Sequence, residues 1–260
     1  MIALFTDFGP AGPYTGQMRA ALHRLAPFVP AIDLLADAPA GDPRGAAYLL
    51  AAYAAGFPPG TVFLCVIDPG VGSDRAAVVA EADGRWFVGP ENGLFALVLR
   101  RAAIARAWTI AWRPPVLSAS FHGRDLFAPV AARLALGAAP PGPERPATGL
   151  DRPDWPDDLG RVVYVDHYGN AITGLRAASV PADARLRVNG RTIARARTFS
   201  AVAAGTVFWY ENANGLAEIA VNAGRADRML NLAPGAEIGI EAASVMEASS
   251  NCNTGVAPPL

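Results

Sequence analysis

The chain has 260 residues, of which 52% are hydrophobic and 17% charged, a balance typical of a globular protein with one large or two modest domains. A formal net charge of −1 provides no general basic field, so nucleic acid is not expected as a partner. All 22 basic residues are arginine, which excludes a lysine Schiff base, a P-loop lysine and a Ser–Lys pair.

The sequence predicts neither a metal centre nor a membrane anchor. The two cysteines, Cys65 and Cys252, do not form the pattern of a metal knuckle or a disulfide framework. The longest Ala/Leu-rich stretch, 46–57, is too short to span a bilayer. The chain opens on a strand-like run without a basic targeting region. We therefore expect a cytoplasmic protein.

The first half of the chain alternates between strand and helix patterns. Strands are predicted at 2–5 and 62–68, with a hairpin over 77–88. Helices are predicted at 15–25, from an Asp42 cap to about residue 55, from Asn92 to about residue 101, and at 124–136. Strands that alternate with helices predict an α/β domain over residues 1–140 with a largely parallel sheet.

The second half has a different pattern. Residues 141–158 are rich in proline and predict a linker. Short alternating runs follow, and Asn189-Gly190 is typical of a type I′ hairpin turn. These runs predict a smaller C-terminal antiparallel β-barrel domain over residues 159–242. We expect a disordered tail over residues 243–260. The predicted strands are 161–165, 185–188, 191–198, 206–210, 217–221 and 237–241.

Three loops of the first half carry reactive side chains where an open α/β sheet usually binds its ligands. Asp7 follows the opening strand and could either accept both hydroxyls of a ribose or cap the next helix. Asp68 and Arg75 flank a glycine-rich turn and could form either an anion–cation pair held by a tight loop or an ordinary surface salt bridge. His122 precedes a predicted helix and could either face a cleft or be structural.

Taken together, these segments resemble the S-adenosylmethionine hydroxide adenosyltransferase family, which is related to the fluorinating and chlorinating adenosyl enzymes. Six blocks in the family's order are distributed over most of the span of residues 1–242, which makes the resemblance specific. The blocks are TDFG (6–9) with PYTGQM (13–18), FPPGTVFLCVIDPGVGSDR (57–75), PENGL (90–94), FHGRDLFAP (121–129), DHYGNAIT (166–173) and ENANGLAEIAVNAG (211–224).

The resemblance implies a fold, an assembly and an activity. It implies an N-terminal α/β domain, a C-terminal β-barrel, and a homotrimer with active sites between the N-domain of one subunit and the C-domain of its neighbour. The implied reaction is hydrolysis of S-adenosylmethionine to adenosine and L-methionine, with no cofactor. In hydrolytic members an Asp–Arg–His triad holds the attacking water, and its matches are Asp68, Arg75 and His122. The implied substrate contacts are Asp7 to the ribose, Tyr168, Asn170 and Ala223 at the adenine, Asn212 and Asn214 around the methionine, and Phe121 and Gly123 beside the triad.

The residue at position 68 also distinguishes hydrolysis from halogenation within the family. Halogenating members carry an aromatic there, whereas a carboxylate repels a halide and attracts water. In the expected mechanism, Asp68 and His122 accept hydrogen bonds from a water in line with the C5′–S bond and take its proton. Arg75 orients the two groups.

Three departures from the family pattern concern substrate binding. Gly12 replaces an Asp that is common in the family, Ala40 or Gly41 replaces an aromatic near the ribose, and Ala213 replaces a common Ser. They leave open a non-catalytic binder of S-adenosylmethionine or adenosine. The other alternative is a metal-dependent hydrolase with Asp7, Asp68 and His122 as ligands, although Arg75 would then place a cation beside the metal.

Overall fold

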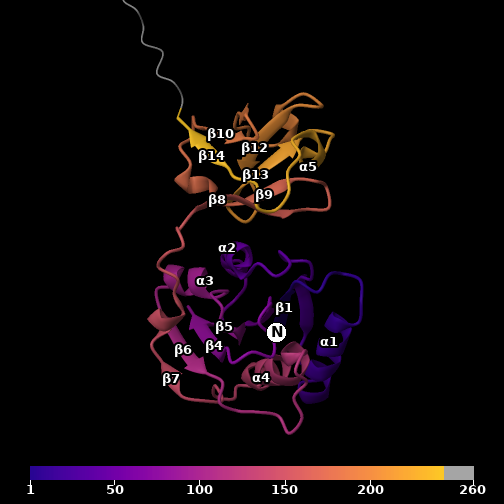
Figure 1. Cartoon of the computed structure of the whole chain (residues 1–260), viewed down its shortest axis with the longest axis vertical. Coiled ribbons are helices and arrows are strands. Elements are labelled where there is room, and N and C mark those ends of the chain that lie inside the picture. Colours follow the sequence, from indigo (N-terminus) through magenta and orange to yellow (C-terminus); the bar gives the residue numbers. More distant parts are fainter. Residues whose placement is uncertain (243–260) are drawn as a thin grey trace, which may run out of the picture.

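The computed structural model describes residues 1–242, which form two parts stacked along the long axis of the molecule (Figure 1). The tail predicted over 243–260 lies outside the described residues. Within the described range, no helix is both long and apolar enough to cross a membrane. The N-terminal part contains β1 (Ile2–Thr6), α1 (Tyr14–Leu25), β2 (Ala31–Leu35), α2 (Pro43–Ala54), β3 (Val62–Val66), β4 (Ala77–Ala82), β5 (Arg85–Pro90), α3 (Ala96–Arg101), β6 (Ala105–Thr109), α4 (Ala128–Ala135) and β7 (Glu144–Arg145).

A seven-stranded sheet in the order β2-β1-β3-β5-β4-β6-β7 forms the centre of this part. The first four strands run parallel, and β4, β6 and β7 extend the other edge in antiparallel pairs. The predicted α/β architecture is confirmed. The sequence prediction missed β2 and β6 because neither is a continuous apolar run: Asp33 interrupts β2, and Arg106 lies near the start of β6.

Both faces of the sheet are covered by helices. Successive residues of a strand point to opposite faces. Ile2 and Leu4 therefore pack in the cluster that contains α1 and α4, while Ala3 and Phe5 pack in the cluster that contains α2 and α3. This double coverage explains why β1 and β3 are buried at every position and why all their residues but Thr6 are apolar.

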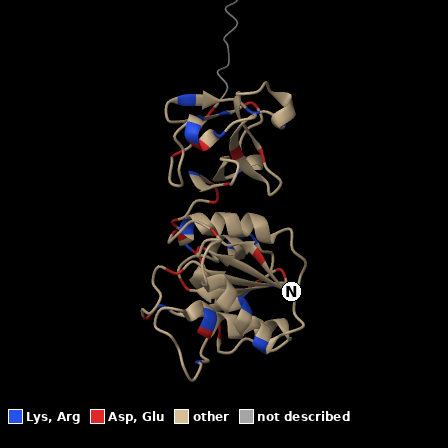
Figure 2. Cartoon of the chain, turned by 90° about the vertical axis from the view of Figure 1, so that its right-hand side faces the viewer, with Lys and Arg blue, Asp and Glu red and all other residues tan. Residues whose placement is uncertain are grey.

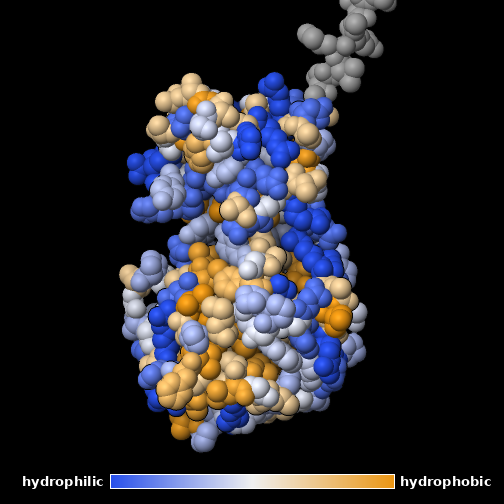
Figure 3. Space-filling model, turned by 180° about the vertical axis from the view of Figure 1, so that it is seen from behind, coloured by the Kyte–Doolittle hydropathy of each residue, from blue (hydrophilic) through white to orange (hydrophobic). Residues whose placement is uncertain are grey.

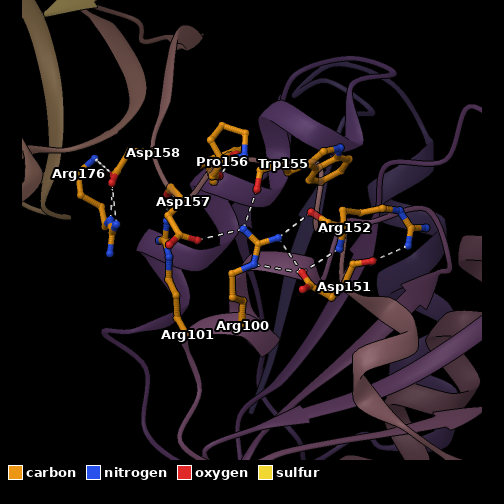
Figure 4. Close-up of polar contacts among 10 residues, drawn as sticks. Arg100, Arg101, Asp151, Arg152, Trp155, Pro156, Asp157, Asp158 and Arg176 are labelled. Carbon is orange, nitrogen blue, oxygen red and sulfur yellow. Dashed lines mark hydrogen bonds and ion pairs between the residues drawn. The ribbon is translucent and has the colours of Figure 1, made fainter.

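The proline-rich segment 141–158 packs against the N-terminal part, and Figure 4 shows the polar contacts of its second half, residues 151–158. Its strand β7 pairs with β6 at the sheet edge, and Leu150 is buried in the core cluster of α2 and α3. The guanidinium of Arg100, on α3, donates to several oxygens of the segment. These are the carboxylates of Asp151 at 2.7 Å and Asp157 at 3.0 Å, and the carbonyls of Arg152 at 2.7 Å and Trp155 at 2.8 Å.

The C-terminal part consists mainly of antiparallel strands. They form two sheets, in the orders β11-β10-β14 and β12-β13-β9-β8. Isolated bridges pair Arg161 with Glu237 and Arg195 with Trp209, and so link the two sheets. The predicted antiparallel β-domain is confirmed, whereas its closure into a barrel stays a prediction. The elements are β8 (Leu159–Val165), β9 (Ala171–Arg176), β10 (Arg185–Val188), β11 (Arg191–Ile193), β12 (Val207–Glu211), β13 (Leu216–Val221), α5 (Ala226–Met229) and β14 (Gly239–Glu241).

The hairpin between β10 and β11 follows the sequence prediction. Asn189 and Gly190 connect the two strands, and both have positive φ angles, of 46° and 75°. Positive φ at both central residues is what a type I′ turn requires. The predicted strand over 191–198 is shorter in the structure, because regular pairing ends at Ile193.

The two parts share an apolar interface at α2. Figure 1 shows this helix beneath the C-terminal strands. Tyr48 of α2 belongs to the same buried cluster as residues of β8, β9 and β13, namely Leu159, Val163, Ile172 and Leu216. Polar contacts also join the two parts, since Arg161 donates to Asp42 at 3.0 Å and Tyr164 to Asp37 at 2.9 Å. Charged residues of both signs are interspersed over both parts (Figure 2).

Candidate active site

Asp7 and Asp68 emerge at the same edge of the sheet. Strands β1 and β3 are parallel neighbours, with Thr6 opposite Val66, so the residues that follow them leave the sheet side by side. Strand β4 runs the other way and begins at Ala77, which returns Arg75 to this edge. Ligands of open α/β sheets usually bind at the carboxyl ends of the strands. Residues far apart in the sequence thus meet where the sequence predicted a site.

The carboxylate of Asp7 is held by the backbone of a second loop. Its Oδ2 accepts a hydrogen bond from the Gly41 N–H at 2.9 Å. Gly41 has a φ of 62°, a conformation that glycine adopts without strain. Burial raises the pKa of Asp7, because desolvation penalises its charged form. One of the two candidate positions for the missing aromatic, Gly41, is therefore a direct hydrogen-bond partner of the carboxylate that is predicted to bind the ribose.

Asp68 and Arg75 form a buried ion pair. Arg75 Nε donates to Asp68 Oδ1 at 2.6 Å, and Nη2 donates to Oδ2. The side chain of Asp68 is 4% exposed and that of Arg75 is 12% exposed. Such a two-point pair fixes both the position and the plane of the carboxylate. The alternative of a surface salt bridge is excluded.

The loop between these two residues packs closely against the segment before His122. Gly72 has a φ of 82°, and a Cβ at this position would lie 2.7 Å from the carbonyl oxygen of Ala119. Ser73 Oγ donates to the carbonyl of Gly70 at 2.7 Å and closes the turn. Glycine is therefore required at position 72, because the two backbones approach each other closely. The loop does not match the sequence pattern of a phosphate-binding loop.

His122 lies at the entrance of a π-helical turn, Gly123–Phe127, that continues into α4. Its Nδ1 is 3.3 Å from Arg75 Nη2. Burial, followed by the nearby charge of Arg75, lowers the pKa of His122 and so favours the neutral ring. The predicted helix over 124–136 is thus correct in position but begins with a wider turn.

The predicted N-terminal site residues converge on one cavity of about 120 Å³. Arg75 reaches it through its pair with Asp68. A neighbouring hollow of about 370 Å³ is lined by Arg75, Ser73, Asp74 and Arg113, and His122 is the one lining residue that the two cavities share. The residues that line the first cavity include Asp7, Phe8, Gly41, Asp68, Phe121, His122 and Gly123.

Two further features of this site were not predicted. The rings of Phe8, Tyr14 and Phe121 contact one another, with centroids 5.6 to 5.9 Å apart, and form an aromatic wall beside the cavity. Asn92 Nδ2 donates to the carbonyl of Ile67 at 2.8 Å and so holds the backbone next to Asp68. From the sequence, Asn92 is predicted only as the start of a helix. Its position within the PENGL block was the signal that could have indicated a role at the site.

The predicted adenine contacts lie together on the C-terminal part. Tyr168, Asn170 and Ala223 line a hollow of about 430 Å³, together with Phe199. Tyr168 is 74% exposed, so its ring is available to a ligand or a neighbouring subunit. Asn170 is buried and donates from Nδ2 to Asp166 at 3.2 Å.

The predicted methionine contacts lie elsewhere on the same part. Asn212 lines a hollow of about 640 Å³ with Arg195, Arg197 and Glu211. Its side chain is already engaged, because Oδ1 accepts from the backbone N–H groups of Asn214 and Leu216, both at 3.0 Å. Neither of these C-terminal hollows shares a lining residue with the Asp68 cavity. The roles of these residues stay predictions.

The arrangement of acidic side chains bears on the metal alternative. Among residues 1–242, no group of three or more His, Cys, Asp and Glu side chains is placed to hold a metal ion. The strongest acidic candidate, Asp68, directs its oxygens to a guanidinium.

The fold and the site define an α/β enzyme architecture, with a carboxylate–guanidinium–imidazole cluster at the carboxyl edge of a parallel sheet. Residues 2–142 match the SAM hydroxide adenosyltransferase N-terminal domain, and residues 160–239 match the SAM hydroxide adenosyltransferase C-terminal domain. The chain belongs to this family, as its sequence motifs predicted.

Similar proteins cover nearly the whole chain. Relatives named (R)-S-adenosyl-L-methionine hydrolase occur in Thermus thermophilus, with 41% identity over 90% of this chain and 96% of the relative, and in Salinispora arenicola, with 38% identity over 93% and 97%. The crystal structure of an uncharacterized conserved protein from Thermotoga maritima has 32% identity and a TM-score of 0.83. That match covers 92% of this chain and 99% of the other.

Proposed function

We propose that the protein hydrolyses S-adenosyl-L-methionine to adenosine and L-methionine, with Asp68, Arg75 and His122 holding the attacking water. The observation that carries the proposal is that Asp68 and His122 line one cavity with Asp7, while Arg75 contacts both of them. The relatives at 38–41% identity that are named for this reaction support it. The proposal includes no metal and no cofactor, and it places the enzyme in the cytoplasm.

The chemistry of the substrate suits such a site. The sulfonium leaves as a neutral thioether, so the enzyme needs no acid for the leaving atom. It must hold a water about 3–3.5 Å from C5′, in line with the C5′–S bond. A positioned base typically contributes about 10²–10⁴-fold to the rate. The buried carboxylate of Asp68 is placed to supply that base.

Asp7 is proposed to hold the ribose. Its carboxylate lines the same cavity as Asp68 but has a different partner, the Gly41 backbone. An ionised carboxylate accepts several hydrogen bonds, so it can bind two vicinal hydroxyls. Anchoring the ribose there would keep C5′ facing the water.

We also propose that the site is completed by a neighbouring subunit in a homotrimer. The Asp68 cavity, of about 120 Å³, is smaller than the roughly 300–1,000 Å³ usual for a small-molecule site. The hollow that contains Tyr168 and Asn170 lies on the other part of the chain. Figure 3 shows hydrophobic surface on the N-terminal part, of the kind that subunit contacts cover.

The decisive experiment is incubation of the purified protein with S-adenosylmethionine, followed by chromatography. Adenosine and methionine should appear in equal amounts. A protein that binds the compound without consuming it would instead be the non-catalytic binder. Light scattering tests the trimer. Mixing inactive Asp68→Ala and Tyr168→Ala proteins under conditions of subunit exchange should restore part of the activity, because some mixed sites combine two intact halves.

A further inference from the structure

We propose that His122 donates a hydrogen bond from Nε2–H to the attacking water, and that Asp68 alone takes the proton. This inference rests on the proposed hydrolysis, and it assigns opposite hydrogen-bonding roles to two groups that were both expected to act as acceptors. Its basis is the contact between His122 and Arg75, which fixes where the imidazole carries its proton.

The contact involves one specific ring nitrogen. Arg75 Nη2 lies 3.3 Å from His122 Nδ1. A guanidinium has five N–H donors and no acceptor, so Nδ1 must accept the hydrogen bond. A neutral imidazole whose Nδ1 is unprotonated carries its hydrogen on Nε2. The neighbouring Arg75 therefore selects the Nε2–H tautomer.

Each of the two protons on Arg75 Nη2 has its own acceptor. One is donated to Asp68 Oδ2, which leaves the other for His122. Nη1 donates to the carbonyl of Ala76 at 3.2 Å, and Nε to Asp68 Oδ1 at 2.6 Å. The guanidinium is thus held on several sides and has little freedom to turn away from the ring. A proton on Nδ1 would point at a fixed cation.

The lining of the two cavities separates Asp68 from Arg75. Asp68 lines the cavity that contains Asp7, Arg75 lines the neighbouring hollow, and His122 lines both. Since Nδ1 faces Arg75, Nε2 is the ring nitrogen left for the water. Each carboxylate oxygen has two lone pairs, so Asp68 keeps acceptor capacity after pairing with Arg75. Arg75 is therefore a positioning residue.

The resulting step is balanced. The water donates one hydrogen to Asp68 and accepts the Nε2–H of His122, which leaves a lone pair directed at C5′. As the O–C5′ bond forms, the C5′–S bond breaks and its electron pair stays on sulfur, giving neutral methionine thioether. The water proton passes to Asp68, and adenosine keeps the new 5′-hydroxyl. Solvent then removes the proton from Asp68.

The two amide substitutions of His122 provide a matched test. The Gln amide nitrogen can occupy the place of Nε2 and donate, whereas the shorter Asn amide replaces Nδ1. Neither amide is a base near neutral pH. We expect His122→Gln to keep kcat within about tenfold of the native enzyme, and His122→Asn to lose about 10²–10³-fold, as for other lost transition-state donors. Equal losses in both variants would overturn the donor role.

Nitrogen NMR measures the tautomer without relying on turnover. The chain has three histidines, so ¹⁵N-histidine labelling gives few signals, and the His122→Gln spectrum identifies the relevant pair. His23→Gln, at an exposed residue of α1, is the control. We expect an unprotonated Nδ1 and a protonated Nε2, and the reverse would overturn the proposal. A protein with the expected tautomer that left S-adenosylmethionine intact would overturn the proposed function instead.

Discussion

The guanidinium of Arg75 bonds both carboxylate oxygens of Asp68, and the two side chains are almost fully withdrawn from solvent. A buried pair of this kind is costly to break, since the remaining charge stays desolvated and uncompensated. The same contact that positions the proposed base therefore also contributes to the local fold. Substitutions here must be judged by both activity and stability.

Asp68→Asn should reduce kcat by about 10²–10⁴-fold, because the amide keeps the shape of the side chain but cannot accept a proton. Binding of S-adenosylmethionine, measured by calorimetry, should change much less. Asp33→Asn, in an exposed pair with Arg19, is the matched control and should keep full activity. Normal turnover by a folded Asp68→Asn protein would remove Asp68 from the mechanism.

Adenosine binding should weaken at acidic pH through protonation of Asp7. Burial raises the pKa of this carboxyl above its ordinary value of 3.8, so it loses its charge at a higher pH than an exposed aspartate. The charged form accepts the ribose hydroxyls, so affinity is full above this raised pKa and falls as pH drops through it. Asp7→Asn should bind weakly at every pH. An Asp7→Asn protein that binds adenosine as tightly as the native protein, with the same pH profile, would contradict the ribose role.

Removal of divalent metals should leave the rate unchanged. The proposed reaction needs no Lewis acid, because the sulfonium already activates C5′. Activity should therefore survive dialysis against a chelator, and added Mg²⁺ or Mn²⁺ should not increase it. A loss of activity that Mn²⁺ restores would favour the metal-dependent alternative with Asp7, Asp68 and His122 as ligands.

Gly72→Ala should lower kcat by at least about tenfold, through displacement of the loop that carries Arg75. Its Cβ would lie 2.7 Å from a backbone oxygen of Ala119, a clash that neither loop can relieve by turning a side chain. Gly190→Ala is the control, since it has a similar φ of 75° and nothing within 4 Å. Positive φ alone costs an alanine on the order of 1 kcal/mol. Equal activity of the two variants would show that the close approach is unimportant.

Arg100→Met should destabilise the protein by roughly 2 kcal/mol, in line with hydrogen bonds made by a charged group. It should also increase cleavage within 141–158 in limited proteolysis, because this side chain fastens the segment to α3 (Figure 4). Arg106→Met, in a solvent-exposed pair with Glu144, should change stability little. A chemical-denaturation curve for Arg100→Met that overlays the native one would contradict the predicted stabilisation.

Local sequence patterns predicted the central elements well. The apolar runs of β1 and β3 are buried on both faces, and Asp42 caps α2 by accepting the Gly45 N–H at 3.0 Å. Such signals depend only on neighbours in the chain. Strands β2 and β6 were missed because their stability comes from pairing with β1 and β4, which no local pattern encodes.

In the site, too, local sequence predicted some properties, while others depend on tertiary packing. Asp68, Arg75 and His122 were identified from motifs, but their burial, the bidentate pair and the nitrogen that faces Arg75 are properties of packing. The sequence also could not predict that the Asn212 side chain accepts hydrogen bonds within its own turn, because hydrogen-bond partners depend on the folded backbone. Residue type indicated the chemistry, and only geometry assigned donors and acceptors.

Strand β7 determines where the N-terminal part can be cut from the rest. A fragment ending at residue 140 would lose both the pairing partner of β6 and the buried side chain of Leu150. The bared edge of β6 would offer free N–H and C=O groups to other molecules, which is a route to aggregation. Ending the fragment after residue 158 would keep that edge covered.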